Sequence, residues 1–275
     1  MNRQCQLEEK TTESHRGIDQ ERLERLNSEI EAFDDIDSYM ELLARPYTRR
    51  LKAEVQRYFS SVKLKGARIL ELGCGISEHA HYFNKDNTMI LTDINWPLLQ
   101  KNNLPSRLML CDAQVLRPFD DDSIDFIIYI GILHHLKDQA RALREARRVL
   151  GPGGRIFICE PNSKSINFIY YRLRLLVIKI FGAKVLRKMI GCVSLDETQL
   201  DVKAVESIFG SGYSLRKWTI LSFRLPPLRL FKRLNFDVVL SDIFDKLPLF
   251  RSIGTTILYE ITSLEKAYVK KRDLK

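Results

Sequence analysis

A glycine-rich turn follows the first short apolar run of the chain. The run 68–72 contains Glu71 and leads into Gly73 and Gly75. Because glycine has no side chain, backbone amides in such a turn can approach a ligand closely. We expect the turn to lead into a helix. Its simplest alternative is a tight strand-to-helix connection with no ligand.

A dinucleotide-binding fold is the first competing interpretation of this turn. That fold carries the pattern Gly-x-Gly-x-x-Gly, and here the third glycine position is Glu78. A carboxylate at that place would crowd and repel a pyrophosphate. The pattern therefore disfavours NAD and FAD.

Acidic residues follow the next two apolar runs. Asp93 closes one of them, eighteen positions after Gly75, and Asp112 closes the other. A carboxylate at Asp93 can accept both hydroxyls of a ribose, and one at Asp112 can accept from an adenine amino group. Asp93 taken alone would equally cap a helix. Since parallel strands meet a ligand at their carboxyl ends, the glycine turn and both acids should converge on one crevice.

A pair of histidines, His134 and His135, follows the fourth apolar run at the same expected edge. Imidazole titrates near neutrality, so either ring can act as a general base. The structural alternative, in which one ring packs and the other bonds a neighbouring backbone group, fits the sequence equally well.

Short apolar runs that alternate with longer segments must position these residues. Runs that are apolar on both faces indicate parallel strands buried on both sides; they are 68–72, 89–92, 108–111, 126–130 and 155–159. Periodicity then predicts helices over 138–150, 202–209 and 228–247, and strands over 213–223 and 255–261. The expected fold is α/β: a doubly wound, Rossmann-like, seven-stranded and mostly parallel sheet with helices on both faces.

Changes in composition divide the chain around this sheet. We expect a polar, partly disordered segment 1–38, a helical cap 39–64, a cofactor-binding core 65–162, an inserted basic and aromatic helical cover 163–200, and a completion of the sheet 201–275.

Together these motifs resemble the class I S-adenosylmethionine-dependent methyltransferases, and within them the small-molecule group called type 11. The resemblance covers about 65–162. It rests on ordered motifs at Ile69–Gly75, Thr92–Ile94, Cys111–Ala113, Pro118–Asp125, Ile130–His135 and Arg147–Gly154. It departs from many relatives at Ser77, where they carry another glycine.

The resemblance implies that S-adenosyl-L-methionine is the cofactor. Its methionine part would lie on the glycine turn, its ribose on Asp93 and its adenine beside Asp112. The implied cofactor-binding residues are Glu71, Gly73, Gly75, Asp93, Ile94, Asp112, Ala113 and Ile130. His134 and His135 would lie next to the sulfonium methyl. No metal site is expected, because the resemblance makes Asp120–Asp122 the turn that enters the fourth strand.

The positive charge of the chain lies in its C-terminal part. Residues 164–275 hold 21 Lys and Arg against 10 Asp and Glu, a net +11, whereas the whole chain is +9. Either an anionic partner or a solvated basic surface explains this excess. With aromatic residues around Tyr170 beside Arg172, it favours a small-molecule, lipid-linked or sugar-like acceptor, anionic or amphiphilic, under a cover. A lid that packs its own aromatics is the alternative.

Other function classes stay open. An RNA or protein methyltransferase would use the basic C-terminal region, although the Asn/Asp-Pro-Pro-Tyr motif of planar-nitrogen methylation is replaced here by 130–133. A non-catalytic cofactor-binding scaffold is the second alternative. The five cysteines are odd in number and never in a Cys-x-x-Cys pair, and no apolar run reaches a membrane-spanning length, so we expect a cytoplasmic protein. Peripheral membrane contact is not favoured, and the oligomeric state stays open.

Overall fold

The computed structural model describes residues 46–83, 85–162, 198–220 and 254–265, together with residues 24, 26, 27, 30, 31, 33, 165 and 180. The predicted segment 1–38, the cover 163–200 and the helix 228–247 lie outside these residues, apart from the few positions named.

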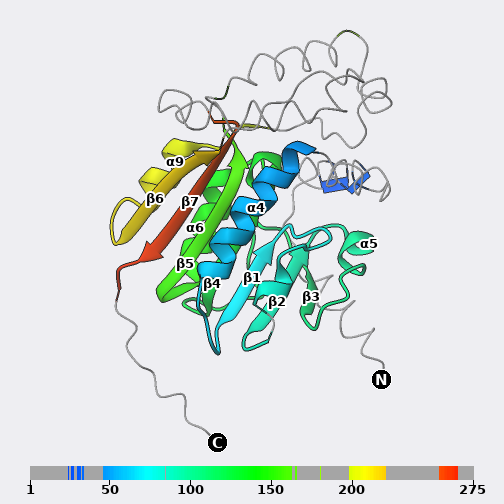
Figure 1. Cartoon of the computed structure of the whole chain (residues 1–275), viewed down its shortest axis with the longest axis horizontal. Coiled ribbons are helices and arrows are strands. Elements are labelled where there is room, and N and C mark those ends of the chain that lie inside the picture. Colours follow the sequence, from blue (N-terminus) through cyan, green and yellow to red (C-terminus); the bar gives the residue numbers. More distant parts are fainter. Residues whose placement is uncertain are drawn as a thin grey trace, which may run out of the picture.

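A sheet with the strand order β3-β2-β1-β4-β5-β7-β6 forms the centre of the described chain (Figure 1). Its strands are β1 (Arg68–Leu72), β2 (Thr88–Asp93), β3 (Arg107–Leu110), β4 (Ile124–Ile130), β5 (Leu150–Pro161), β6 (Tyr213–Ile220) and β7 (Thr256–Ser263). β1 to β5 pair in parallel, and β7 runs antiparallel to both β5 and β6. The predicted doubly wound, mostly parallel seven-stranded sheet is confirmed.

Helices flank the sheet, and side-chain caps fix where three of them begin. The α-helices are α4 (Pro46–Ser61), α5 (Trp96–Leu99), α6 (Gln139–Val149) and α9 (Val202–Ile208), and short 3₁₀ turns cover Ala80–Tyr82 and Leu133–His135. Asp138 accepts from the Arg141 amide at the start of α6, and Asp201 accepts from the Ala204 amide at the start of α9. Each cap satisfies an amide that has no partner within the helix.

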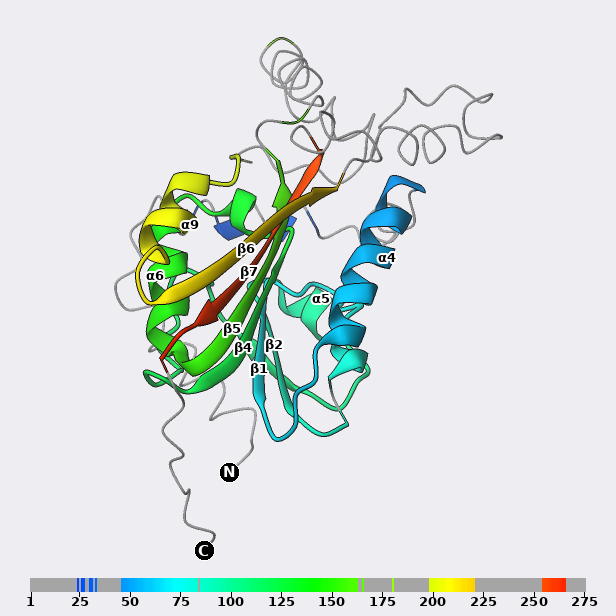
Figure 2. The same cartoon turned by 60° about the vertical axis from the view of Figure 1, so that its left-hand side comes forward.

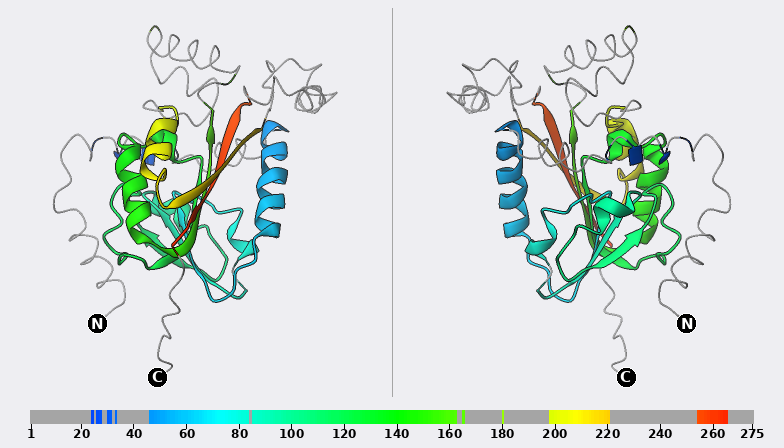
Figure 3. Two further views of the ribbon diagram at one scale, coloured as in Figure 1. Left: turned by 90° about the vertical axis from the view of Figure 1, so that its left-hand side faces the viewer. Right: turned by 90° about the vertical axis from the view of Figure 1, so that its right-hand side faces the viewer.

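The two faces of the sheet carry separate cores. Figure 3 shows α6 and α9 on one face and α4 and α5 on the other. Leu143 and Phe209 are fully buried on the first face, and on the second Phe59 of α4 packs edge-on against Phe157 with ring centroids 5.0 Å apart. Burial on both faces makes the central strands a rigid support for the loops at their carboxyl ends.

Two local expectations are wrong. The glycine turn leads into a short 3₁₀ turn over Ala80–Tyr82 rather than an α-helix. The Ser77 hydroxyl accepts from the His79 and Ala80 amides at 3.2 and 3.1 Å as the chain enters that turn. β3 is not buried on both sides: it lies at the edge of the sheet, and Leu110 is 37% exposed.

The opposite edge of the sheet is formed by β6, with β7 between it and β5. Figure 2 brings these two strands to the front. The structure also shows where α6 ends. Its last residue is Val149, and the chain enters β5 directly at Leu150. The helix predicted over 138–150 is therefore observed one residue shorter at each end.

Candidate active site

The carboxyl ends of β1 to β4 lie at one edge of the sheet. Leu72 pairs with Thr92 and with Tyr129, so Gly73, Asp93 and Ile130 follow at the same level. Asp93 in turn pairs with Leu110, and Asp112 comes two residues later. The structure thus brings together the residues that the sequence marked at successive strand ends.

The glycine turn is held by the carboxylate at the end of the neighbouring strand. Gly73 and Gly75 have φ values of +61° and +51°, which disfavour any residue with a Cβ. Asp93 Oδ2 accepts from the Gly75 amide at 2.7 Å, and Oδ1 accepts from the Asn95 amide at 2.8 Å. Asp93 is therefore part of the turn's own architecture as well as a candidate ligand contact.

Gly73 also lies against the turn that follows β4. A Cβ on Gly73 would come within 2.0 Å of Ile132 Cδ1. Glycine is thus required at this position by packing as well as by its φ. The close approach brings the segment around His134 beside the glycine turn.

Ser77, which replaces a glycine of many relatives, ties the turn to β1. Its hydroxyl donates to Glu71 Oε2 at 2.6 Å, and its amide donates to Asn102 Oδ1 at 2.7 Å. Asn102 closes the loop by donating to the Gly75 carbonyl at 2.9 Å. Sequence reasoning missed Asn102, because nothing in its local pattern sets it apart from other loop residues.

Burial dominates the electrostatics of the two acids beside the turn. Burial raises the pKa of Glu71 to about 7, with a smaller opposing effect of the Ser77 hydroxyl. Burial also raises the pKa of Asp93, against the hydrogen bonds from the Asn95 and Gly75 amides. Desolvation penalises the charged form in both cases.

Asp112 lies on a loop after β3 that turns back on itself. Its Oδ1 accepts from the Gln114 amide at 2.8 Å, and Gln114 Oε1 accepts from the Asp138 amide at 3.0 Å. The neighbouring Ala113 is buried and Ile94, after β2, is half-buried. These bonds fix the loop relative to the start of α6.

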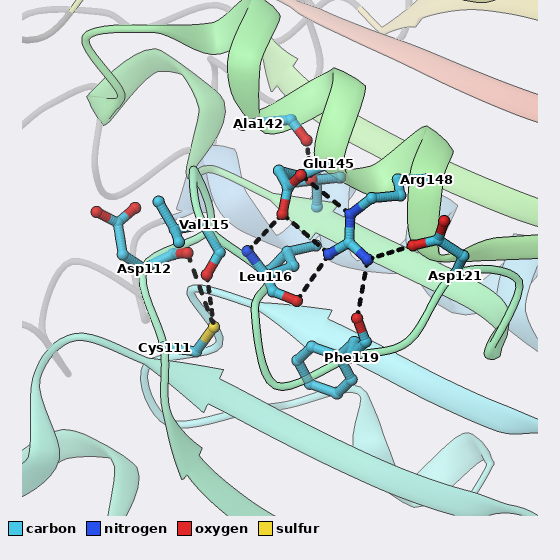
Figure 4. Close-up of polar contacts among 10 residues, drawn as sticks. Cys111, Asp112, Val115, Leu116, Phe119, Asp121, Ala142, Glu145 and Arg148 are labelled. Carbon is cyan, nitrogen blue, oxygen red and sulfur yellow. Dashed lines mark hydrogen bonds and ion pairs between the residues drawn. The ribbon is translucent and has the colours of Figure 1, made fainter. Parts of the chain in front are cut away.

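The guanidinium of Arg148 on α6 anchors the rest of the same loop (Figure 4). It donates to the carbonyls of Leu116 and Phe119, each at 2.9 Å, and to Asp121 at 2.7 Å. Glu145 completes the network, because its Oε2 accepts from Arg148 at 3.0 Å and from the Leu116 amide at 2.9 Å. Sequence reasoning treated this arginine only as part of a motif.

The acidic cluster before β4 is a turn. Asp121 pairs with Arg148, and Asp122 adopts a positive φ of 54°. The Asp122 amide donates to the Arg148 carbonyl at 3.0 Å. Within the described residues, no group of acids, histidines and cysteines is arranged to hold a metal ion.

A buried glutamate that sequence reasoning missed holds the turn after β4. Glu160 is the next-to-last residue of β5, and its side chain is 0% exposed. Its Oε1 accepts from the Ile132 and Leu133 amides at 2.9 and 2.7 Å, and its Oε2 lies 2.6 Å from His134 Nδ1. Twenty-six residues separate Glu160 from His134, so no local spacing connects them.

His135 and the return of the chain complete the surroundings of His134. The two histidine rings lie 4.0 Å apart, and Phe33 contacts His135 edge-on at 5.5 Å. The Thr198 amide donates to the His134 carbonyl at 2.6 Å. Thr198 is itself held by Gln139 of α6, whose Nε2 donates to its hydroxyl at 2.9 Å.

Comparison with known proteins bears on what this edge does. The model of the type 11 family, described as a methyltransferase domain, matches residues 70–158, from β1 into β5. The chain carries a class I S-adenosylmethionine-dependent methyltransferase domain. Every strand end described above, from the glycine turn to the turn after β4, belongs to this domain.

Curated relatives of the methyltransferase domain differ in how far their similarity extends. 27-O-demethylrifamycin SV methyltransferase of Amycolatopsis mediterranei is 29% identical over 186 residues, 60% of this chain and 64% of its own. The ubiquinone/menaquinone biosynthesis C-methyltransferase of Idiomarina loihiensis is 31% identical over 122 residues (38% and 48%). A mouse protein named probable tRNA methyltransferase 9B is 33% identical over 106 residues (37% and 23%). The chain spans less than two thirds of each relative's length.

Solved structures show the same fold around the methyltransferase domain. A SAM-dependent methyltransferase from Thermotoga maritima superimposes with a TM-score of 0.57 at 16% identity, covering 85% of this chain and 99% of its own. At that identity the likeness establishes the fold alone. Among the described helices, none is both long and apolar enough to cross a membrane.

Proposed function

We propose that this chain transfers a methyl group from S-adenosylmethionine to a small-molecule acceptor, with the cofactor on the carboxyl edge of β1 to β4. The observation that carries the proposal is Asp93, which holds the glycine turn through the Gly75 amide and still has capacity for a ligand. A pseudoenzyme used only as a scaffold has less reason to keep this arrangement.

The residues at this edge fit the cofactor. A carboxylate has about four lone-pair sites, and the Gly75 and Asn95 amides take one on each oxygen of Asp93. The Ile94 backbone also bonds Asp93, which leaves about one lone-pair site for a ribose hydroxyl. Asp112, on its anchored loop, is positioned by the Gln114 amide to accept from an adenine amino group. Ile94, Ala113 and Ile130 would supply apolar contacts.

Glu71 would serve the methionine end. It is buried directly beneath the glycine turn and bonded to Ser77. A carboxylate in this place favours an ammonium group over any anion. The cofactor brings an activated sulfonium methyl, so the main tasks of the protein are to align an acceptor behind that methyl and to exclude water.

The extent of the similarity to the relatives favours a small-molecule acceptor. The similarity to 27-O-demethylrifamycin SV methyltransferase extends over 186 residues, whereas the similarity to the probable tRNA methyltransferase 9B stops at 106 residues, close to the length of the cofactor domain alone. Similarity beyond the cofactor domain points toward a shared way of receiving an acceptor. We expect an anionic or amphiphilic acceptor in the cytoplasm, because the basic excess lies after residue 163.

Calorimetry with S-adenosylhomocysteine tests the cofactor half of this proposal. We expect micromolar or tighter binding by the wild type and a loss of at least about 30-fold in Asp93→Ala, since a charged hydrogen-bond partner contributes about 2–3 kcal/mol. Absence of binding by the wild type, or equal binding by the variant, would refute it.

Label transfer tests the acceptor half. Methyl-labelled S-adenosylmethionine is incubated with the protein and fractionated extract of the source cell. Uptake of label into a low-molecular-mass fraction is expected. Uptake confined to RNA or to protein would replace the small-molecule assignment with one of those alternatives.

A further inference from the structure

We propose that His134 is the catalytic base for a hydroxyl-bearing acceptor and that Glu160 is the positioning residue that fixes its tautomer. This proposal rests on the proposed methyltransferase function and narrows its acceptor class to hydroxyl compounds that need deprotonation.

The contacts of Glu160 make it an acceptor toward the histidine. Its Oε1 accepts two backbone amides, from Ile132 and Leu133, and its Oε2 lies 2.6 Å from His134 Nδ1. A carboxylate can only accept hydrogen bonds. The proton of the neutral imidazole must then be on Nδ1.

This tautomer gives His134 the lone pair that a base needs. With the proton on Nδ1, the Nε2 atom of the neutral ring is an acceptor. A buried carboxylate also stabilises the imidazolium that forms when Nε2 takes a proton. The Glu160 side chain is 0% exposed and that of His134 is 13% exposed, so solvent competes little for the bond between them.

The position of the pair matches that of an acceptor site. Ile132, two residues before His134, lies against Gly73 of the cofactor turn. On its other side the His134 backbone is held by Thr198, where the described chain returns after the segment that follows Asn162. The pair therefore lies beside the cofactor turn, at the point where the described chain resumes at Thr198.

The chemical step balances without another reactant. The acceptor hydroxyl gives its proton to His134 Nε2 as its oxygen attacks the methyl carbon. The bond between that carbon and the sulfonium sulfur breaks, and the sulfur keeps the electron pair as a neutral thioether. The imidazolium then returns its proton to solvent.

A purely structural role for Glu160 is the rival explanation, and Glu160→Gln separates the two. The glutamine Oε1 can still accept from Ile132 and Leu133, so the turn stays anchored. Its amide nitrogen faces His134 Nδ1 as a donor, which moves the ring proton to Nε2 and removes the basic lone pair. Glu260→Gln is the matched control, because Glu260 is also a largely buried β-strand glutamate and bonds Tyr58 at 2.9 Å outside this site.

The test combines three measurements on the full chain. Nitrogen-15 NMR of the imidazole rings, with and without S-adenosylhomocysteine, reports the His134 tautomer. Calorimetry reports S-adenosylhomocysteine affinity. Transfer of labelled methyl into the extract fraction found above, followed by mass spectrometry of the product, reports turnover and the methylated atom.

We expect the Nδ1–H tautomer in the wild type and the Nε2–H tautomer in Glu160→Gln. Turnover should fall at least about 100-fold, the usual range for loss of a general base, with cofactor affinity changed less than about twofold. His134→Gln should lose turnover to the same extent, and Glu260→Gln should match the wild type. The product should carry an O-methyl group.

Several results would overturn the proposal. They are an Nε2–H tautomer in the wild type, wild-type turnover in Glu160→Gln or His134→Gln, loss of cofactor binding in Glu160→Gln, or a C-methylated product. Failure of the wild type to bind S-adenosylhomocysteine would instead refute the proposed function. The tautomer measured without ligand would still decide the role of Glu160.

Discussion

Two turns at the carboxyl edge of the sheet are each held by a carboxylate from the neighbouring strand, but the two carboxylates differ in their other hydrogen-bond partners. The turn after β1 is held by Asp93 from the adjacent β2, and the turn after β4 is held by Glu160 from the adjacent β5. Each oxygen of Asp93 accepts a hydrogen bond from a backbone amide, whereas one oxygen of Glu160 lies against the imidazole of His134.

Under the two proposals above, the same arrangement of carboxylate and turn would serve cofactor binding at one strand end and proton transfer at the other. A carboxylate that anchors only backbone keeps lone pairs for a ligand. A carboxylate that also holds a titratable ring determines which ring nitrogen carries the proton. The following predictions test this distinction.

Neutralising each carboxylate in turn should affect different properties. Asp93→Asn is expected to weaken S-adenosylhomocysteine binding by about 30-fold or more, because an amide replaces a charged acceptor. Glu160→Gln should leave that affinity within about twofold. Calorimetry on both variants checks this, and equal losses would mean that the two turns do not divide binding from proton transfer.

Alanine at the glycine of each turn should separate packing from backbone strain. Gly73 and Gly131 have φ values of +61° and +67°, but a Cβ at Gly73 would meet the Ile132 side chain, whereas one at Gly131 would have nothing within 4 Å beyond its chain neighbours. We expect Gly131→Ala to cost about 1–2 kcal/mol in the free energy of unfolding, from the left-handed backbone alone. Gly73→Ala should cost about 2 kcal/mol more, from the displaced Ile132. Urea unfolding measures both, and equal costs would contradict the close packing of the two turns.

The loop after β3 is held by a positively charged residue, Arg148, where the other two turns are held by carboxylates. Arg148→Met should lower the free energy of unfolding by about 2 kcal/mol, because the carbonyls of Leu116 and Phe119 lose their donors. Cofactor affinity should fall severalfold as the Asp112 loop loosens. Arg144→Met, at an exposed position of the same helix, is the control and should change stability by less than about 0.5 kcal/mol. A similar effect in both variants would contradict the anchoring role.

The pH dependence of stability should reveal the buried Glu71. Its pKa of about 7 in the folded protein lies above the ordinary value of 4.5. Its contribution to stability is therefore complete below about pH 4.5 and is lost as pH rises through 7. Glu71→Gln keeps the bond to Ser77 and removes this loss, so the variant should gain stability relative to the wild type between pH 5 and pH 8. Asp93, whose pKa is also raised, contributes with the same sign in both proteins. A difference that stays constant with pH would contradict this.

Much of the sheet could be predicted because its strands are local apolar runs. β1 was predicted at its observed bounds, and α9 was predicted to within one residue of its observed end. Asp93 and Asp112 were also predictable, since a strand end fixes which edge a following acid occupies. Their roles toward a cofactor stay predictions.

The rest depended on contacts between distant residues. Glu160 acts on His134 across two parallel strands, and Asn102 acts on the glycine turn across β2. The chain after that turn forms a 3₁₀ turn over Ala80–Tyr82, which the local sequence pattern did not reveal. The exposure of β3 depends on its place at the sheet edge, which an apolar run does not reveal.

The order of strands also has a consequence for biosynthesis. β7, formed by residues 256–263, lies between β5 and β6 and supplies the only strand that β6 pairs with in the described sheet. The parallel strands β1 to β5 can assemble as they leave the ribosome, because each pairs with strands already made. β6 must wait as an unpaired edge until residues 256–263 emerge. A chain that ends before residue 256 would therefore contain the parallel strands β1 to β5 together with β6, whose backbone hydrogen-bonding groups would have no partner strand.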